Sequence, residues 1–173
     1  MIKTIAILGA TEKYASALAE GLASDCNRLL LFSDQQAELL ALRENILQKN
    51  PNVSIEITDC ASEASWQADI VVLAVCIDLQ RLMSGSIADF VTQKTLLAFV
   101  SSKDDVSNLF TSNVLQQLLP HTHVVPVYLT EDQRHGKLFY ASAINEAALE
   151  EAESLLISAG FFPELLNKSN SIN

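Results

Sequence analysis

Short runs of apolar residues alternate with longer amphipathic stretches along almost the whole chain. The apolar runs are rich in Val, Ile and Leu, have the length of β-strands, and lie at residues 2–8, 28–32, 53–57, 69–75, 95–100 and 123–129. This composition is typical of strands that are buried on both faces. Between the runs, apolar residues recur at spacings of three and four, as Leu18 and Leu22 do after the first run. Such spacings place side chains on one face of a helix.

Strands that alternate with helices predict right-handed crossover connections and a parallel sheet covered by helices on both faces. The expected fold class is therefore α/β, with a doubly wound, mostly parallel sheet. A further strand is expected at Lys137–Ser142, followed by a helix that Asn145 caps and Gly160 ends. We expect one domain over residues 1–166 and a polar tail over residues 167–173.

Composition excludes several classes of protein. Hydrophobic residues make up 49% of the 173 residues, which is too many for a disordered chain, yet no apolar run approaches the ~20 residues of a membrane span. The net charge of −10 is spread over both halves without a basic stripe, which argues against nucleic-acid binding. Three cysteines form no CxxC pair and no secretory signal is apparent, so a reducing cytoplasm is the expected location.

In a doubly wound sheet, ligands bind beyond the carboxyl ends of the strands, and the first strand-to-helix turn receives the pyrophosphate of a dinucleotide. That turn lies at residues 9–16 here. The following residues are candidates for binding a cofactor because each lies in this turn or at the carboxyl end of the second, fourth or fifth strand: Gly9, Ala10, Thr11, Glu12, Lys13, Tyr14, Ser33, Asp34, Ala74, Val75, Cys76 and Ser101.

Several segments carry a resemblance to a known family. They are Ile7-Leu8-Gly9-Ala10-Thr11, residues 16–23, residues 68–75, Leu119-Pro120, residues 145–148 and Ala159-Gly160-Phe161. Over nearly its whole length the chain resembles the NADP-binding domain of coenzyme F-420 (deazaflavin) dependent NADP oxidoreductases, and more distantly pyrroline-carboxylate reductases and mammalian ferric reductase domains. The resemblance implies a Rossmann-like fold and hydride transfer between NAD or NADP and a deazaflavin, a flavin or a small substrate. It also implies a homodimer.

The phosphate-binding turn departs from the family pattern at two positions. Glu12 and Ala15 stand where the family has its second and third glycines. A carboxylate ~5 Å from a pyrophosphate costs about 3 kcal/mol per charge pair at an effective dielectric constant near 20, or roughly a hundredfold in affinity. Alternatively, the Glu12 side chain points into solvent beside Lys13, and Ala15 adds one methyl group between helix and strand. Weak dinucleotide binding is expected under both interpretations.

Asp34 stands where the NADP-using relatives often have arginine. An acidic residue about 20 residues beyond the phosphate-binding turn accepts hydrogen bonds from a free ribose diol and repels a 2′-phosphate, so Asp34 favours NAD over NADP. A second interpretation makes Asp34 the N-cap of a helix that begins at Gln35. The sequence leaves both open.

Cysteine and histidine side chains are the remaining candidates for chemistry. Cys76 replaces a proline of the family at the end of the fourth strand, and the absence of a neighbouring base in the sequence favours a buried, inert thiol over a nucleophile. His121 and His123 would share one face of an extended segment, as two metal ligands do, but they lie at the amino end of the sixth strand, away from the expected site, and have no recognisable third ligand. No metal site is predicted.

Two classes of function remain. A short-chain dehydrogenase would need a Tyr-x-x-x-Lys pair, which none of the three tyrosines forms. An oxidoreductase of the family above needs no such pair, because the cofactors carry the chemistry of hydride transfer, and no catalytic residue can be named. The alternative is a non-catalytic Rossmann-fold protein that binds or senses another ligand after losing tight dinucleotide binding.

Overall fold

The computed structural model describes residues 2–25, 28–75, 83–101, 109–130, 137–141 and 145–166. Its strands are β1 (Thr4–Leu8), β2 (Arg28–Phe32), β3 (Ser54–Ile57), β4 (Ile70–Leu73), β5 (Thr95–Ser101), β6 (His123–Thr130), β7 (Lys137–Ala141) and β8 (Glu164–Leu166). Its helices are α1 (Lys13–Leu22), α2 (Gln36–Lys49), α3 (Ala61–Gln67), α5 (Leu109–Leu118) and α6 (Glu146–Ser158), with short 3₁₀ turns η1 (Ala23–Asp25) and η2 (Ala88–Phe90). Residues 83–87 are also helical.

One sheet holds all of these strands in the order β3-β2-β1-β4-β5-β6-β7-β8. β1 to β6 run parallel to one another, β7 pairs antiparallel with β6, and β8 pairs parallel with β7. The expected doubly wound, mostly parallel α/β fold is confirmed. The expected strand after residue 136 is confirmed as β7, whereas β8 has no counterpart among the expected strands.

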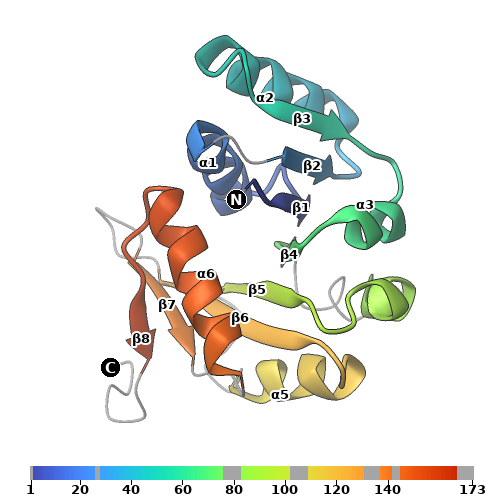
Figure 1. Cartoon of the computed structure of the whole chain (residues 1–173), viewed down its shortest axis with the longest axis vertical. Coiled ribbons are helices and arrows are strands. Elements are labelled where there is room, and N and C mark those ends of the chain that lie inside the picture. The colour runs from blue at the N-terminus through green and yellow to red at the C-terminus, as the bar shows by residue number, and fades with distance from the viewer. Residues whose placement is uncertain are drawn as a thin grey trace.

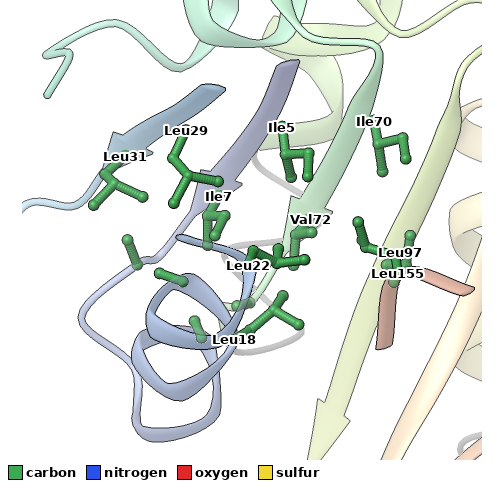
Figure 2. Close-up of a cluster of buried hydrophobic side chains, with 14 of the residues drawn as sticks. Ile5, Ile7, Leu18, Leu22, Leu29, Leu31, Ile70, Val72, Leu97 and Leu155 are labelled. Carbon is green, nitrogen blue, oxygen red and sulfur yellow. The ribbon is translucent and has the colours of Figure 1, made fainter. Parts of the chain in front are cut away.

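Helices cover both faces of the sheet, as Figure 1 shows. α1, α2 and α6 pack on one face, against the side chains of Ile5 and Ile7 and their neighbours on adjacent strands. Figure 2 shows part of this cluster, with Leu18 and Leu22 of α1 and Leu155 of α6 beside the strand residues. α3, α5 and residues 83–87 pack on the other face, against Ala6 and Leu8 and their neighbours. Successive residues of a strand point to opposite faces, so a strand between two helical layers is apolar throughout. All four residues of β4 are buried for this reason.

The ends of α6 lie where the sequence predicts them. The Asn145 side chain accepts a hydrogen bond from the backbone N–H of Ala148 at 3.2 Å and caps the first turn. Gly160 has a φ of +85°, and the amides of Gly160 and Phe161 donate to the carbonyls of Ile157 and Leu156. These two bonds form a Schellman motif, which ends a helix at a residue of left-handed conformation.

Residues 167–173, the predicted polar tail, lie outside the described residues. No helix in the described part of the chain is both long enough and apolar enough to cross a membrane.

Candidate functional site

The strand order reverses between β1 and β4, and this switch point locates the candidate site. The chain proceeds from β1 outward through β2 to β3, then returns to β4 on the other side of β1 and continues to β5 and β6. Leu8 at the end of β1 is level with Phe32 of β2 and with Leu73 of β4. The segments that follow these three strands therefore meet at one edge of the sheet, where open α/β sheets bind their ligands.

Gly9 is required by the geometry of the first turn. Its φ is +86°, and a Cβ at this position would lie 2.6 Å from Val75 Cγ1 and 3.1 Å from the carbonyl carbon of Ala74. The amides of Gly9 and Ala10 both donate to the carbonyl of Phe32, at 2.9 and 3.0 Å. A residue with a side chain would strain the turn and collide with β4's continuation. The glycine that this chain retains is the one that its backbone needs.

Glu12 and Ala15 are accommodated without backbone strain in this turn. Glu12 has φ −62° and ψ 143°, an extended conformation open to any residue, and its side chain is exposed. Ala15 is 1% exposed and packs in the core on the α1 face of the sheet. The solvent-facing interpretation of Glu12 and the single added methyl group of Ala15 both agree with this arrangement.

The N-terminus of α1 is open toward the same edge. Glu12 is the N-cap residue, yet its side chain makes no capping hydrogen bond, and the first turn contains no acidic residue. The amides of Lys13, Tyr14 and Ala15 donate to no other residue that the structure describes. Unsatisfied amides at the N-terminus of a ten-residue helix attract an anion. Lys13 adds a cation there, with Nζ 5.5 Å from the centroid of the Tyr14 ring.

Ser33 and Asp34 follow β2, and the first is buried against the turn after β1 whereas the second is exposed. Ser33 is 3% exposed, and its Oγ lies 2.7 Å from Thr11 Oγ1. Asp34 is exposed, and its carboxylate has no hydrogen-bond partner among the described residues. The interpretation of Asp34 as the N-cap of a helix beginning at Gln35 is wrong: α2 begins at Gln36, and its N-cap is Gln35 without a side-chain hydrogen bond. The Asp34 carboxylate is thus available to a ligand.

Of the candidate residues at the ends of β4 and β5, those that the structure describes lie at the same edge of the sheet. Ala74 is 8% exposed and its amide donates to the Leu8 carbonyl at 2.8 Å, which holds Ala74 beside Gly9. Cys76 lies outside the described residues. Ser101 is the last residue of β5 and pairs with Leu129 of β6, three residues beyond the level at which Ala98 pairs with Leu73.

His121 and His123 lie at the opposite edge of the sheet. His121 is exposed, and His123 begins β6, half-buried, with Nδ1 3.3 Å from Nδ2 of Asn145. Within the described ranges, no three His, Cys, Asp or Glu side chains are grouped as metal ligands. A cavity of about 670 Å³ lies beside the two histidines and is also lined by Gln116 and Asn145. The sequence pattern gives no sign of this cavity, because residues from separate segments, before β5, before β6 and at the start of α6, line it together.

Comparison with protein-family models found no match, and comparison with curated protein sequences also found none. Solved structures do match. A Mycobacterium tuberculosis 3-hydroxyisobutyrate dehydrogenase gives a TM-score of 0.74 at 14% identity, over 95% of this chain and 54% of the other. A Plasmodium falciparum pyrroline carboxylate reductase with NADP bound gives 0.66 at 16%, over 97% of this chain and 59% of the other.

A third solved structure belongs to the kind of protein that the sequence resembles. An Arthrobacter protein assigned as an F-420-dependent NADP reductase gives a TM-score of 0.68 at 19% identity, over 93% of this chain and 82% of the other. Identities this low show a shared fold and nothing finer. The chain spans little more than half the length of the first two proteins. By its strand order and by these likenesses, the chain has the Rossmann-like fold found in NAD(P)-dependent dehydrogenases and reductases.

Proposed function

We propose that the chain binds a nicotinamide dinucleotide at the carboxyl edge of β1, β2 and β4 and takes part in hydride transfer. The observation that carries the proposal is the first turn. Gly9 lies against Ala74 and Val75 with a φ of +86°, and the first amides of α1 donate to no described residue. A tight glycine turn before an open helix N-terminus is suited to a pyrophosphate.

The β2 end supports NAD as the preferred dinucleotide. The Asp34 carboxylate is exposed and is not used to cap α2. A carboxylate at this point accepts hydrogen bonds from the two hydroxyls of an unmodified ribose and repels a 2′-phosphate. Among the proteins of similar fold, an Aquifex aeolicus prephenate dehydrogenase was solved with NAD⁺ and a Myxococcus stipitatus imine reductase with NADP⁺, so this fold accommodates both dinucleotides.

The hydride partner that we propose is a deazaflavin, a flavin or a small substrate. Its support is the sequence resemblance to the F-420-dependent family together with the Arthrobacter structure of the same fold. When bound, the dinucleotide supplies the hydride chemistry itself. The described residues would hold the phosphates at α1 and orient the adenosine ribose at Asp34.

Two further proposals concern the state of the protein in the cell. We propose a homodimer, in which a second copy of the chain covers the nicotinamide half of the site. Light scattering on the purified protein measures the mass of the assembly and so tests whether it is a dimer. We also propose a cytoplasmic location, which the odd number of cysteines without a CxxC pair supports. Among the described residues, Cys60 is an exposed free thiol, as a reducing compartment allows.

Calorimetric titration with NADH, NADPH and their oxidised forms at physiological salt tests the central proposal. We expect binding in the micromolar to submillimolar range, with NADH tighter than NADPH. A protein that binds none of the four up to about a millimolar contradicts the proposal. The exposed position of Glu12 at the α1 N-cap then favours the second candidate, a non-catalytic Rossmann-fold protein whose dinucleotide site has been lost.

A further inference from the structure

Two hydroxyl groups join the two loops that form the adenosine side of the site. Thr11 belongs to the turn after β1 and Ser33 to the turn after β2, 22 residues apart, and their Oγ atoms lie 2.7 Å apart. Ser33 is 3% exposed and Thr11 is half-buried. The distance is that of a good O–H···O hydrogen bond, in which one hydroxyl donates to the other.

Ser33 also shapes the turn that carries Asp34. Its Oγ accepts a hydrogen bond from the Gln35 amide at 3.2 Å, and its carbonyl accepts one from Nε2 of Gln36 at 3.1 Å. Asp34 lies between the anchored Ser33 and the anchored Gln35. The position of its backbone therefore follows from the position of the Ser33 hydroxyl.

The turn after β1 is fixed to the same point. The amides of Gly9 and Ala10 donate to the carbonyl of Phe32, which directly precedes Ser33. These bonds hold the start of the turn, and the Thr11 hydroxyl is the one side-chain link between residues 9–12 and the β2–α2 turn among the described hydrogen bonds. Beyond Thr11 the chain enters α1, whose open amides face the same edge.

We propose that Thr11 and Ser33 are positioning residues, which hold the Asp34 carboxylate at a fixed place relative to the α1 N-terminus so that one dinucleotide reaches both. This inference rests on the function proposed above. A ribose bound at Asp34 and a pyrophosphate bound at α1 are joined by a short covalent linkage in one ligand, so affinity depends on the separation of the two protein groups. Thr11 and Ser33 set that separation and act through Asp34.

The test uses Thr11→Val, which keeps the shape of the side chain and removes its hydroxyl, and Thr11→Ser, which restores the hydroxyl. We expect Thr11→Val to weaken NADH binding about fivefold, the effect of one neutral hydrogen bond, and Thr11→Ser to recover most of the loss. We expect the affinity for NADPH to change by less than twofold in Thr11→Val, so the preference for NADH over NADPH decreases together with the NADH affinity. Thr92→Val, at an exposed threonine of the opposite sheet edge, is the matched control and changes neither affinity.

A double-mutant cycle separates positioning from direct contact. In an Asp34→Asn background, Thr11→Val should cost NADH affinity less than twofold, because the group it positions has lost its charge. An equal loss in both backgrounds means that Thr11 touches the ligand and overturns the inference. An unchanged NADH affinity in Thr11→Val also overturns it, whether or not the melting temperature falls. If the unaltered protein binds no dinucleotide, the proposed function fails and this inference fails with it, which is a distinct result.

Discussion

Glu12 is the single residue whose charge bears most directly on the proposed dinucleotide site. Its backbone is extended and its carboxylate is exposed at the N-cap of α1. We expect Glu12→Gln to raise the affinity for NADH about tenfold at low ionic strength, and Glu12→Gly at least as much, because each removes a negative charge near the pyrophosphate. The gain should shrink in high salt, which screens exposed charges. Calorimetry at two salt concentrations measures both effects.

Glu150→Gln is the control for this comparison, since it removes an exposed carboxylate from α6. Its affinity for NADH should match that of the unaltered protein. If Glu12→Gln binds NADH no better than this control, the charge of Glu12 does not weaken NADH binding. The shape of the turn at residues 12 and 15 would then have to account for any weak binding.

Under the proposed function, Asp34 is a second single residue with a testable effect, on the choice between NADH and NADPH. We expect Asp34→Ser to reduce the preference for NADH over NADPH at least tenfold, because a hydrogen bond to a charged group contributes about 1.5–3 kcal/mol. Competitive titration of the two cofactors gives the ratio directly. Asp89→Ser, at an exposed acid in η2, should leave the ratio unchanged. Equal affinities in the unaltered protein would refute the role of Asp34.

At the scale of elements, α1 and α6 depend on a glycine for their close packing. A Cβ at Gly21 would lie 2.1 Å from the carbonyl oxygen of Ala159 and 2.8 Å from its Cα, so α1 and the end of α6 must separate to admit it. We expect Gly21→Ala to lower the free energy of unfolding by about 1–3 kcal/mol. Gly85→Ala is the matched control because no atom lies within 4 Å of the added Cβ, and it should be neutral or stabilising. Urea unfolding distinguishes them.

The lysine Lys94, from the segment before β5, binds the carbonyl groups at the C-terminal end of α3. Lys94 Nζ donates to the carbonyls of Ser65 and Trp66, each at 2.8 Å. Burial lowers the pKa of Lys94 below its ordinary value of 10.5, and the nearby Asp69 carboxylate opposes part of the shift. Removing both bonds with Lys94→Met should cost about 1–2 kcal/mol of stability.

The pH dependence of this cost has a definite sign. Between the lowered pKa of Lys94 in the folded protein and 10.5, the unfolded chain binds more protons than the folded one. The contribution of Lys94 to the free energy of unfolding therefore rises with pH across that window and is smallest below it. Unfolding of the unaltered protein and of Lys94→Met at about pH 8 and about pH 10 should show a difference that grows with pH. A difference that falls contradicts the assignment.

For the whole molecule, hydrophobic patterning is enough to predict the layers. Within the predicted run 69–75, the strand β4 (Ile70–Leu73) is buried throughout, as a central parallel strand has to be. β8 could not be predicted, because three residues are too few to show a period and its pairing with β7 depends on where α6 ends. Hydrophobic patterning therefore predicts long buried strands well and short edge strands such as β8 poorly.

The candidate site also has a part that the sequence predicts and a part that it does not. The order of strands and helices places Gly9, Asp34 and Ala74 at one edge before any coordinate is known. The Thr11–Ser33 hydrogen bond joins residues 22 positions apart, and no spacing rule indicates it. α2 begins at Gln36, one residue later than the capping interpretation of Asp34 requires, so Asp34 lies outside the N-cap position.

The two outermost strands of the sheet have a consequence for how molecules of this protein meet one another. An edge strand presents unpaired backbone groups and serves as a template for fibrillar aggregation, more so when it is long and apolar. Here the outer strands β3 and β8 have four and three residues, and each carries an exposed glutamate, Glu56 and Glu164. Arg28 holds Glu56 at 2.8 Å. The outermost described strands are thus short and carry charged side chains, which disfavours the joining of two copies by extension of the sheet.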